Sequence, residues 1–418
     1  MQKHETGFLT KFATVLIILY GIYYKPIDWV ATDAPIKNAL MAMSIIILFT
    51  YSFKISKALI IGTLYLIYQC ISANFHPESW RWSTIIYSIM LTLTYVSFYN
   101  LVTIEKVFTI NHFIKICKWM MMTYFVVCII QQLFLLAGFS YVPAINLWKV
   151  LDRGIGCNSL SFEPSSFARF MLVFYYAYIK CCEYKRGEGP FTLSELFSGE
   201  HKWVTIRFLW MMTTMGSGTA FVCLILFSLY FVRRHNWYYV IPILAICYLL
   251  IQASGIEHLD RATGVMNKVA QLDQAGAQEV DGSGASRISP LLNSLKADFS
   301  DPETWFGHGT DYNINNKLFL KQEGTLFDDY GFIFYIISMI LCFSCGYNFL
   351  SLGTIFMFAG VGGGCGGNIQ YAWELMMVMT CVKYFYENKH DPEIYENEEE
   401  CEESDKEDVE EELETAVK

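Results

Sequence analysis

Few ionisable side chains stand within the long apolar runs of this 418-residue sequence, and those few are its candidates for chemistry. Arg169 lies in an otherwise apolar segment, about two turns into the helix that Pro164 is expected to begin. An Arg in hydrocarbon costs about 3 kcal/mol even on mild scales, so such residues face a cavity or a partner. Glu163 fits the start of the same helix, where a carboxylate complements the helix dipole. Arg153 lies upstream in a Gly-rich turn. These residues form the first candidate site.

A second candidate lies in residues 286–331. Arg287 precedes a predicted short helix, and its planar fork of donors suits a diphosphate, with a solvated surface charge as the alternative. His308 stands between Gly307 and Gly309, and glycines permit close approach of the backbone to a ligand. A structural role for this loop His is the other interpretation.

The turn Thr213–Thr219 is a third candidate. Its small and hydroxyl-bearing residues, Ser217 and Thr219 among them, fit tight packing between two helices. They also fit the lining of a polar cavity, and both interpretations stay open.

The composition indicates what holds these residues in place. Hydrophobic residues make up 54% of the chain and charged residues 17%, against about 25% charged in typical soluble domains. The apolar residues come in blocks of about 17–22, the length that crosses about 30 Å of hydrocarbon. Residues 387–418 hold 16 acidic and 3 basic residues, so the net charge of the rest is −10 − (−13) = +3. No basic patch exists, which excludes nucleic-acid binding.

We therefore predict an all-α transmembrane bundle of about twelve spans, within a range of 10–13. The expected spans are Leu9–Tyr24, Ile36–Phe53, Ala58–Asn74, Thr84–Ile104, Cys117–Phe139, Ser166–Tyr184, Trp203–Met215, Thr219–Val232, Trp237–Ala253, Tyr330–Gly346, Phe349–Val361 and Ile369–Tyr386.

The positions of Lys and Arg in the short loops predict the orientation, because these residues favour the cytoplasmic side. With the N-terminus inside, cytoplasmic segments collect Lys3, Lys11, Lys54, Lys57, Lys106, Lys115, Lys118, Lys185, Arg186, Lys202, Arg233, Arg234, Lys383 and Lys389. The opposite short loops hold Lys25, Lys37, Arg81, Lys149 and Arg153. Both termini are therefore expected in the cytoplasm.

Four regions follow from this topology. Residues 1–253 form spans one to nine, with an exoplasmic loop at 140–165. Residues 254–329 form a large exoplasmic loop with predicted helices at Asp260–Ala275 and Pro290–Ala297. Residues 330–386 form the last three spans, and residues 387–418 form an acidic, disordered cytoplasmic tail.

In their order along the chain, these features resemble the O-antigen polymerase and O-antigen ligase superfamily of bacterial polytopic membrane proteins. The span number and the single large late loop are similar over the whole chain. Arg153 through Ala168 resembles the family's "R…G…NPN..A" segment, with Glu163-Pro164-Ser165 in place of Asn-Pro-Asn. Thr214–Thr219 resembles the "SxSRtg" turn, with Gly218 where Arg is usual. Arg287 with residues 305–309 resembles "R…a…plfGxGxg", and residues 328–331 resemble the "HN.fl…..G..G" segment.

The resemblance implies a GT-C-like membrane glycosyltransferase that joins polyprenyl-diphosphate-linked repeat units outside the bacterial inner membrane. Arg153, Arg169 and Arg287 would bind the diphosphate of the substrate, which carries the developing charge. Glu163 would be the catalytic base, with His308 in reserve. Ser217 and Thr219 would line the cavity. No metal and no other cofactor is expected, since no Asp-x-Asp pair occurs in a short early exoplasmic loop.

Three alternatives remain. The ligases have a His before the span that follows the large loop, whereas this chain has Glu323 and Asp328–Asp329 there, which favours the polymerase over the ligase. A transporter fits the span number, but no internal repeat is evident. A scaffold subunit of a polysaccharide system is the third. A flippase and a chain-length regulator of the same pathway are the expected protein partners, beside the lipid bilayer.

Overall fold

The computed structural model describes residues 3–22, 34–79, 81–139, 142, 155–231, 238, 242, 264, 267–268, 276, 279–280, 289–318, 323–348, 351–361 and 370–395. All secondary structure within these residues is helical, which confirms the predicted class for this part of the chain. The elements are α1 (Lys3–Tyr20), α2 (Ala34–Thr50), α3 (Lys57–Phe75), α4 (Trp82–Thr103), α5 (Ile110–Leu136), α6 (Pro164–Arg186), α7 (Leu193–Leu196), α8 (His201–Thr214), α9 (Gly218–Ser228), η1 (Leu229–Phe231), α14 (Pro302–Phe306), α15 (Tyr312–Asn315), α17 (Gly331–Leu341), η2 (Cys342–Gly346), α18 (Leu352–Val361), α19 (Gln370–Glu387) and η3 (Pro392–Ile394).

Each predicted span other than the ninth overlaps a helix, but α1, α2 and α5 end at Tyr20, Thr50 and Leu136, before the predicted spans do. The ninth, Trp237–Ala253, lies outside the described residues apart from two single positions. By length and apolar character, α3, α4 and α5 can each cross a membrane, and the apolar parts of α1, α2, α9 with η1, and α17 with η2 are shorter.

Local sequence signals set the helix ends. Ser56 and Thr109 cap α3 and α5, because each side chain accepts a hydrogen bond from the N–H three residues later, both at 3.2 Å. Pro164 occupies the first turn of α6, and Gly187 ends that helix with φ of 71°, a left-handed conformation that Gly adopts without strain. The helices therefore begin and end largely where the sequence signals stand.

The outer surface of α3 is apolar. Ile60, Leu64, Ile67 and Ile71, which recur every three or four residues, are all at least half exposed. The small and polar residues of the same helix are buried against its neighbours, and they include Ala58, Gly62, Gln69 and Ser72. A helix with its apolar stripe outward fits an environment of lipid rather than water.

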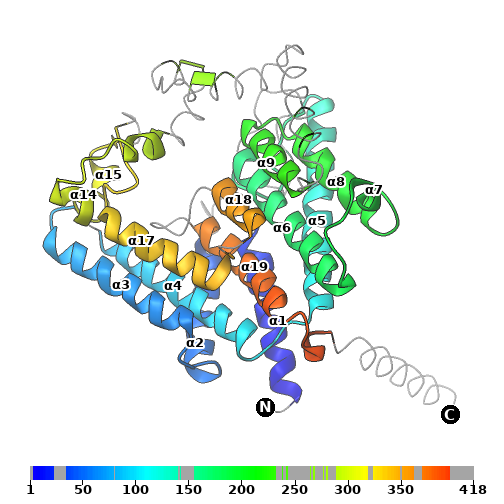
Figure 1. The fold of residues 1–418 in the computed structure, drawn as a ribbon, viewed down its shortest axis with the longest axis horizontal. Coiled ribbons are helices and arrows are strands. Elements are labelled where there is room, and N and C mark those ends of the chain that lie inside the picture. Colours follow the sequence, from blue (N-terminus) through cyan, green and yellow to red (C-terminus); the bar gives the residue numbers. More distant parts are fainter. Residues whose placement is uncertain are drawn as a thin grey trace.

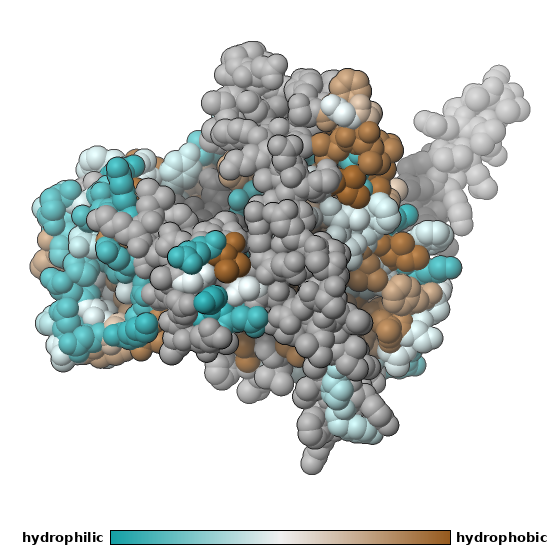
Figure 2. Space-filling view, turned by 90° about the horizontal axis from the view of Figure 1, so that it is seen from above, coloured by the Kyte–Doolittle hydropathy of each residue, from teal (hydrophilic) through white to brown (hydrophobic). Residues whose placement is uncertain are grey.

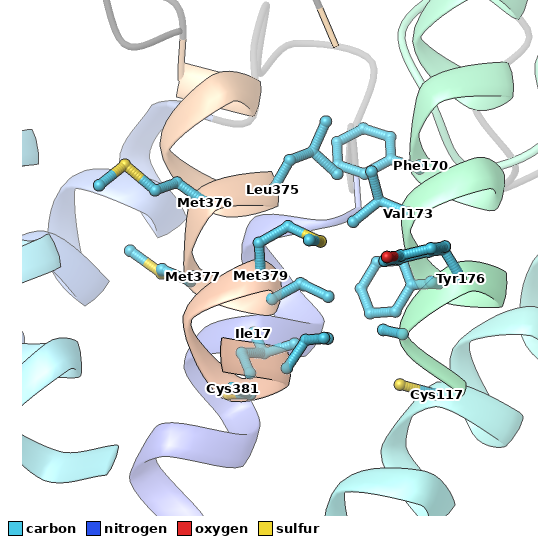
Figure 3. Close-up of a cluster of buried hydrophobic side chains, with 14 of the residues drawn as sticks. Ile17, Cys117, Phe170, Val173, Tyr176, Leu375, Met376, Met377, Met379 and Cys381 are labelled. Atoms are coloured by element: carbon cyan, nitrogen blue, oxygen red, sulfur yellow. The ribbon is translucent and has the colours of Figure 1, made fainter. Parts of the chain in front are cut away.

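The helices form two groups joined by α19. In Figure 1, α2, α3, α4 and α17 lie on the left and α5, α6, α8 and α9 on the right. The central helix α19 packs on both α4 and α6. Figure 3 shows Leu375 and Met379 of α19 facing Phe170, Val173 and Tyr176 of α6.

The two ends of the bundle are fastened differently. At one end, here called the Lys106 end, the ammonium of Lys106 contacts Asp391 and Glu393, and the Tyr395 hydroxyl donates to the Tyr184 carbonyl at 3.3 Å. At the opposite end, here called the Asp311 end, the N–H of Arg81 donates to Asp311 at 3.1 Å. Figure 2 shows hydrophilic residues gathered on the side of the molecule that carries α14 and α15.

Two predicted regions differ from the structure in extent. The predicted helix Pro290–Ala297 is helical over residues 289–294, and the helix predicted at Asp260–Ala275 lies almost wholly outside the described residues. Residues 388–395, which the sequence assigned to the tail, fold back on the Lys106 end, and Ile394 is buried. Four side chains of that segment hold it to the bundle: buried Ile394, Asp391 and Glu393 with Lys106, and Tyr395 with Tyr184. Residues 396–418 lie outside the described residues.

Candidate functional site

A mostly buried non-helical segment, residues 155–163, leads into α6, and Phe162 is its exposed residue. The Ser159 hydroxyl donates to the Tyr124 carbonyl at 2.6 Å, and Gln131 brackets the Ser159 backbone with bonds of 2.7 and 3.0 Å. Tyr124 lies about 21 Å along the 27-residue helix α5. The segment therefore reaches the middle of α5. Asn158, Ser159 and Ser161 are each at most 2% exposed, so this polar backbone is enclosed by protein.

Glu163 stands at the N-cap position of α6, as the sequence predicts, but its carboxylate does not cap the helix. Its side chain accepts no capping hydrogen bond from a backbone N–H of the first turn, and instead accepts one from the side-chain hydroxyl of Ser165. The side chain is partly exposed. A carboxylate in this setting can still accept a proton from a hydroxyl brought beside it.

Arg169 lies on the side of α6 that faces α9. The two helices pack together, and Arg169 is within electrostatic range of Cys223 of α9. Thr219 stands four residues before Cys223, on the same face of α9. Arg169 and Thr219 therefore border the same helix interface.

The turn before α9 is tied to α5. The Gln132 amide donates to the Thr214 hydroxyl at 2.7 Å and accepts from the Trp210 indole at 3.0 Å. Ser217 and Thr219 are partly exposed and begin α9. Three of the predicted site elements thus lie on or beside α5, α6 and α9: Glu163, Arg169 and the Ser217–Thr219 turn.

His308 lies elsewhere, on the α3–α4–α17 group. Its Nε2 is 2.7 Å from a Glu303 carboxylate oxygen, and its ring stacks on Tyr312 with centroids 4.4 Å apart. The backbone N–H of His308 donates to the Asp328 carbonyl at 2.8 Å. The fold does not bring His308 into the group around Glu163.

The glycines beside His308 serve the protein's own packing, which differs from the expected close approach to a ligand. Gly307 and Gly309 have φ of 77° and 102°. A Cβ on Gly307 would lie 2.6 Å from the Asp329 carbonyl, and one on Gly309 would lie 2.3 Å from the His76 Cβ. These glycines let residues 305–310 press against the start of α17 and the turn after α3.

That packing leaves a cavity of about 300 Å³ at the Asp311 end. Two imidazoles, two carboxylates, two amides, a hydroxyl and a phenol line it: His76, Glu78, Ser79, Glu303, His308, Tyr312, Asn315 and Asn316. The Asn315 amide donates to the Ser79 carbonyl at 2.6 Å, which fixes the two walls to each other. Such a lining offers donors and acceptors for a hydroxyl-rich ligand.

Arg153 and Arg287 lie outside the described residues, so their predicted contacts with a diphosphate stay predictions.

Glu374 is a buried carboxylate that was not singled out in the sequence. It lies one turn into α19 and is 1% exposed among apolar neighbours. A single carboxylate inside an apolar span was the available signal, since such residues are costly in a membrane and usually functional.

Neither the protein-family models nor the curated proteins give a match to this sequence.

Proposed function

We propose that this chain is a membrane glycosyltransferase that polymerises polyprenyl-diphosphate-linked oligosaccharide repeat units into a surface polysaccharide. In this proposal about twelve spans form a GT-C-like fold in a bacterial inner membrane, with both termini in the cytoplasm. The Asp311 end then faces outward, and so does the half of the bundle that holds Glu163.

In the proposed reaction a saccharide hydroxyl attacks the anomeric carbon of the donor sugar. The new glycosidic C–O bond forms as the bond between that carbon and the diphosphate breaks. Glu163 accepts the proton of the attacking hydroxyl. Polyprenyl diphosphate leaves with both electrons of the broken bond, and Arg169, Arg153 and Arg287 stabilise its charge.

The observation that carries this proposal is the enclosed segment 155–163 and the charges that follow it. Irregular backbone at the depth of a membrane is tolerated only where protein buries it or where it lines a cavity. Here its hydrogen bonds to Tyr124 and Gln131 fix the start of α6, which bears both Glu163 and Arg169. A proton acceptor and a cation on adjacent turns of one rigid element suit transfer from a diphosphate.

The cavity at the Asp311 end has amides and carboxylates that can form hydrogen bonds with sugar hydroxyls. Because it lies apart from Glu163, it would hold a part of the saccharide distant from the attacking hydroxyl.

A ligase remains the second candidate on one specific observation. The ligases carry a His just before the span that follows the large loop. In this chain the backbone N–H of His308 donates to the carbonyl of Asp328, which lies three residues before α17. A His is therefore close to the start of this span in the fold, although it is distant in the sequence. A ligase would transfer a finished glycan to a lipid acceptor and would produce no ladder from repeat units alone.

Glu163→Gln tests the proposal. Gln keeps the shape of the side chain and its bond with Ser165, so a structural role predicts a loss of at most about 1 kcal/mol. A base predicts a rate at least about 10²-fold lower. The measurement is the ladder of lipid-linked saccharide made by purified protein, with and without a chelator.

Glu188→Gln is the matched control, since Glu188 is an exposed carboxylate just beyond the opposite end of α6. Wild-type laddering by Glu163→Gln would reduce Glu163 to a structural residue. Loss of activity with chelator would contradict the metal-independent mechanism.

A further inference from the structure

Glu374 has neighbours that connect α19 with the segment 155–163. A Cβ on Gly21, the residue after α1, would lie 2.4 Å from Oε1 of Glu374, so the carboxylate packs directly on that backbone. The carbonyl of Gly21 accepts a hydrogen bond from the Tyr124 hydroxyl. The end of α1 therefore lies between a carboxylate of α19, which contacts it, and a phenol of α5, which donates a hydrogen bond to it.

Tyr124 continues the connection toward the candidate site. Its hydroxyl is 3.4 Å from the Ser161 hydroxyl, and its backbone carbonyl accepts from Ser159. Its ring stacks on Phe167 of α6, with centroids 5.5 Å apart. Ser161 stands two residues before Glu163. A chain of contacts thus leads from Glu374 through Gly21, Tyr124 and Ser161 to the start of α6.

A packing role alone does not explain a carboxylate at this position. The neighbouring buried residues of α19 are Met, Leu, Val and Trp, and Figure 3 shows Leu375 and Met379 at the α19–α6 interface. Met or Leu would fill the same volume without the cost of a charged or strongly polar group in the bundle interior. The carboxylate therefore has a role that depends on its polarity.

We propose that Glu374 is a positioning residue, which acts through Gly21 and the Tyr124 hydroxyl to hold residues 155–163, and thereby Glu163, in place. The catalytic part of this proposal rests on the proposed function. The structural part, a polarity-dependent hold of α19 on the 155–163 segment, does not.

The structural part is tested by labelling Cys157, which is fully buried on Cys128 with their sulfurs 3.4 Å apart. The protein is full-length and purified in detergent, with exposed Cys70 replaced by Ser. Glu374→Gln and Tyr124→Phe should each raise the rate of Cys157 modification by a small maleimide about 10-fold, because each loosens the segment. Cys223, buried in α9, reports general unfolding and should keep its rate.

Glu183→Gln is the matched control for a buried carboxylate. Glu183 is 4% exposed on α6, but it lies toward the Lys106 end, where it pairs with Lys180. It should leave the Cys157 rate unchanged. An unchanged Cys157 rate in both test variants, or an equal rise at Cys223, would overturn the proposal.

The catalytic part is tested by a double-mutant cycle in the laddering assay. Glu374→Gln and Tyr124→Phe should each lower kcat about 10-fold with KM for the lipid-linked saccharide unchanged. The double variant should be no slower than the slower single one, because both act along one chain of contacts. Additive losses, or wild-type kcat in Glu374→Gln, would overturn this part. If the wild type makes no polymer but Cys157 responds as expected, the proposed function fails and the positioning role stands.

Discussion

At the scale of single residues, the carboxylates near α17 have hydrogen-bond partners that could not be predicted from the sequence. Asp311 accepts from the Thr84 hydroxyl and the Arg81 N–H, and Asp328 accepts from the Thr325 N–H at 2.6 Å. Asp329 accepts from the Asn313 N–H at 2.8 Å. Burial raises the pKa of Asp329 to about 6, with the charges of Asp328 and Asp311 adding to the rise and the Asn313 bond opposing it.

This raised pKa predicts how stability varies with pH. Between about pH 4 and pH 6 the folded protein holds the Asp329 proton while the unfolded chain releases it. The contribution of Asp329 is therefore greatest below about pH 4 and falls as pH rises through 6, by up to about 3 kcal/mol. Asp329→Asn should be more stable than the wild type at pH 7, and the difference should shrink toward pH 4. Thermal unfolding in detergent measures it.

Asp298→Asn is the control, because hydrogen bonds from Ser300 lower the pKa of the exposed Asp298. Its contribution to stability therefore changes with pH in the opposite direction to that of Asp329. A gain in stability from Asp329→Asn that is equal at pH 4 and pH 7 would contradict the assignment.

At the scale of elements, the end of the α17–η2 span depends on one cation. The ammonium of Lys383 on α19 donates to the carbonyls of Phe343, Ser344 and Tyr347 at 2.7, 2.8 and 3.1 Å. The last carbonyls of a helix lack partners within the helix, and a cation there also complements the helix dipole. Lys383 thus ends one helix and fastens it to another.

Lys383→Met should therefore destabilise the protein by about 2–3 kcal/mol, since it leaves three carbonyls at the end of the span without this donor. Lys389→Met, at an exposed position beyond α19, is the matched control and should change stability by at most about 0.5 kcal/mol. Chemical unfolding of both variants in the same detergent measures the difference. Equal effects would show that the three bonds add nothing.

At the scale of the whole molecule, the fold separates two polar ends by an apolar belt. Exposed large apolar residues stand along α2, α3 and α5, among them Ile46, Ile60 and Leu133. Residues 298–331 lie at the Asp311 end, and residues 388–395 lie at the Lys106 end. In the proposed membrane arrangement, this belt lies in the bilayer and we expect the two segments on opposite sides.

Labelling of intact cells tests this arrangement. Single cysteines replace exposed Asn316 at one end and exposed Glu393 at the other. A membrane-impermeant maleimide should modify Asn316→Cys in intact cells and Glu393→Cys only after lysis. The reverse pattern would invert the topology and place the proposed site in the cytoplasm, which would exclude the polymerase.

The helices could be predicted from the sequence alone. Backbone groups in an apolar setting must find partners within their own segment, so long apolar runs form helices whatever their neighbours. Caps such as Ser56 and Thr109, and Pro164 at the start of α6, place the boundaries within a few residues. Glu163 and Arg169 could be singled out for the same reason, since a charge near or within an apolar helix is visible in one dimension.

Which of these residues meet depends on helix packing and could not be predicted from the sequence. Three of the contacts join residues that are from about 20 to more than 350 positions apart in the sequence: Gln131 with Ser159, Glu374 with Gly21, and His308 with Asp328. Such contacts depend on which helix faces pack together, and apolar faces of similar composition carry little information about their partners. The sequence placed His308 in a second candidate site, and the family resemblance made it the reserve base for Glu163. Packing keeps His308 in another group of helices and links Glu374 to the segment before Glu163 through Gly21 and Tyr124.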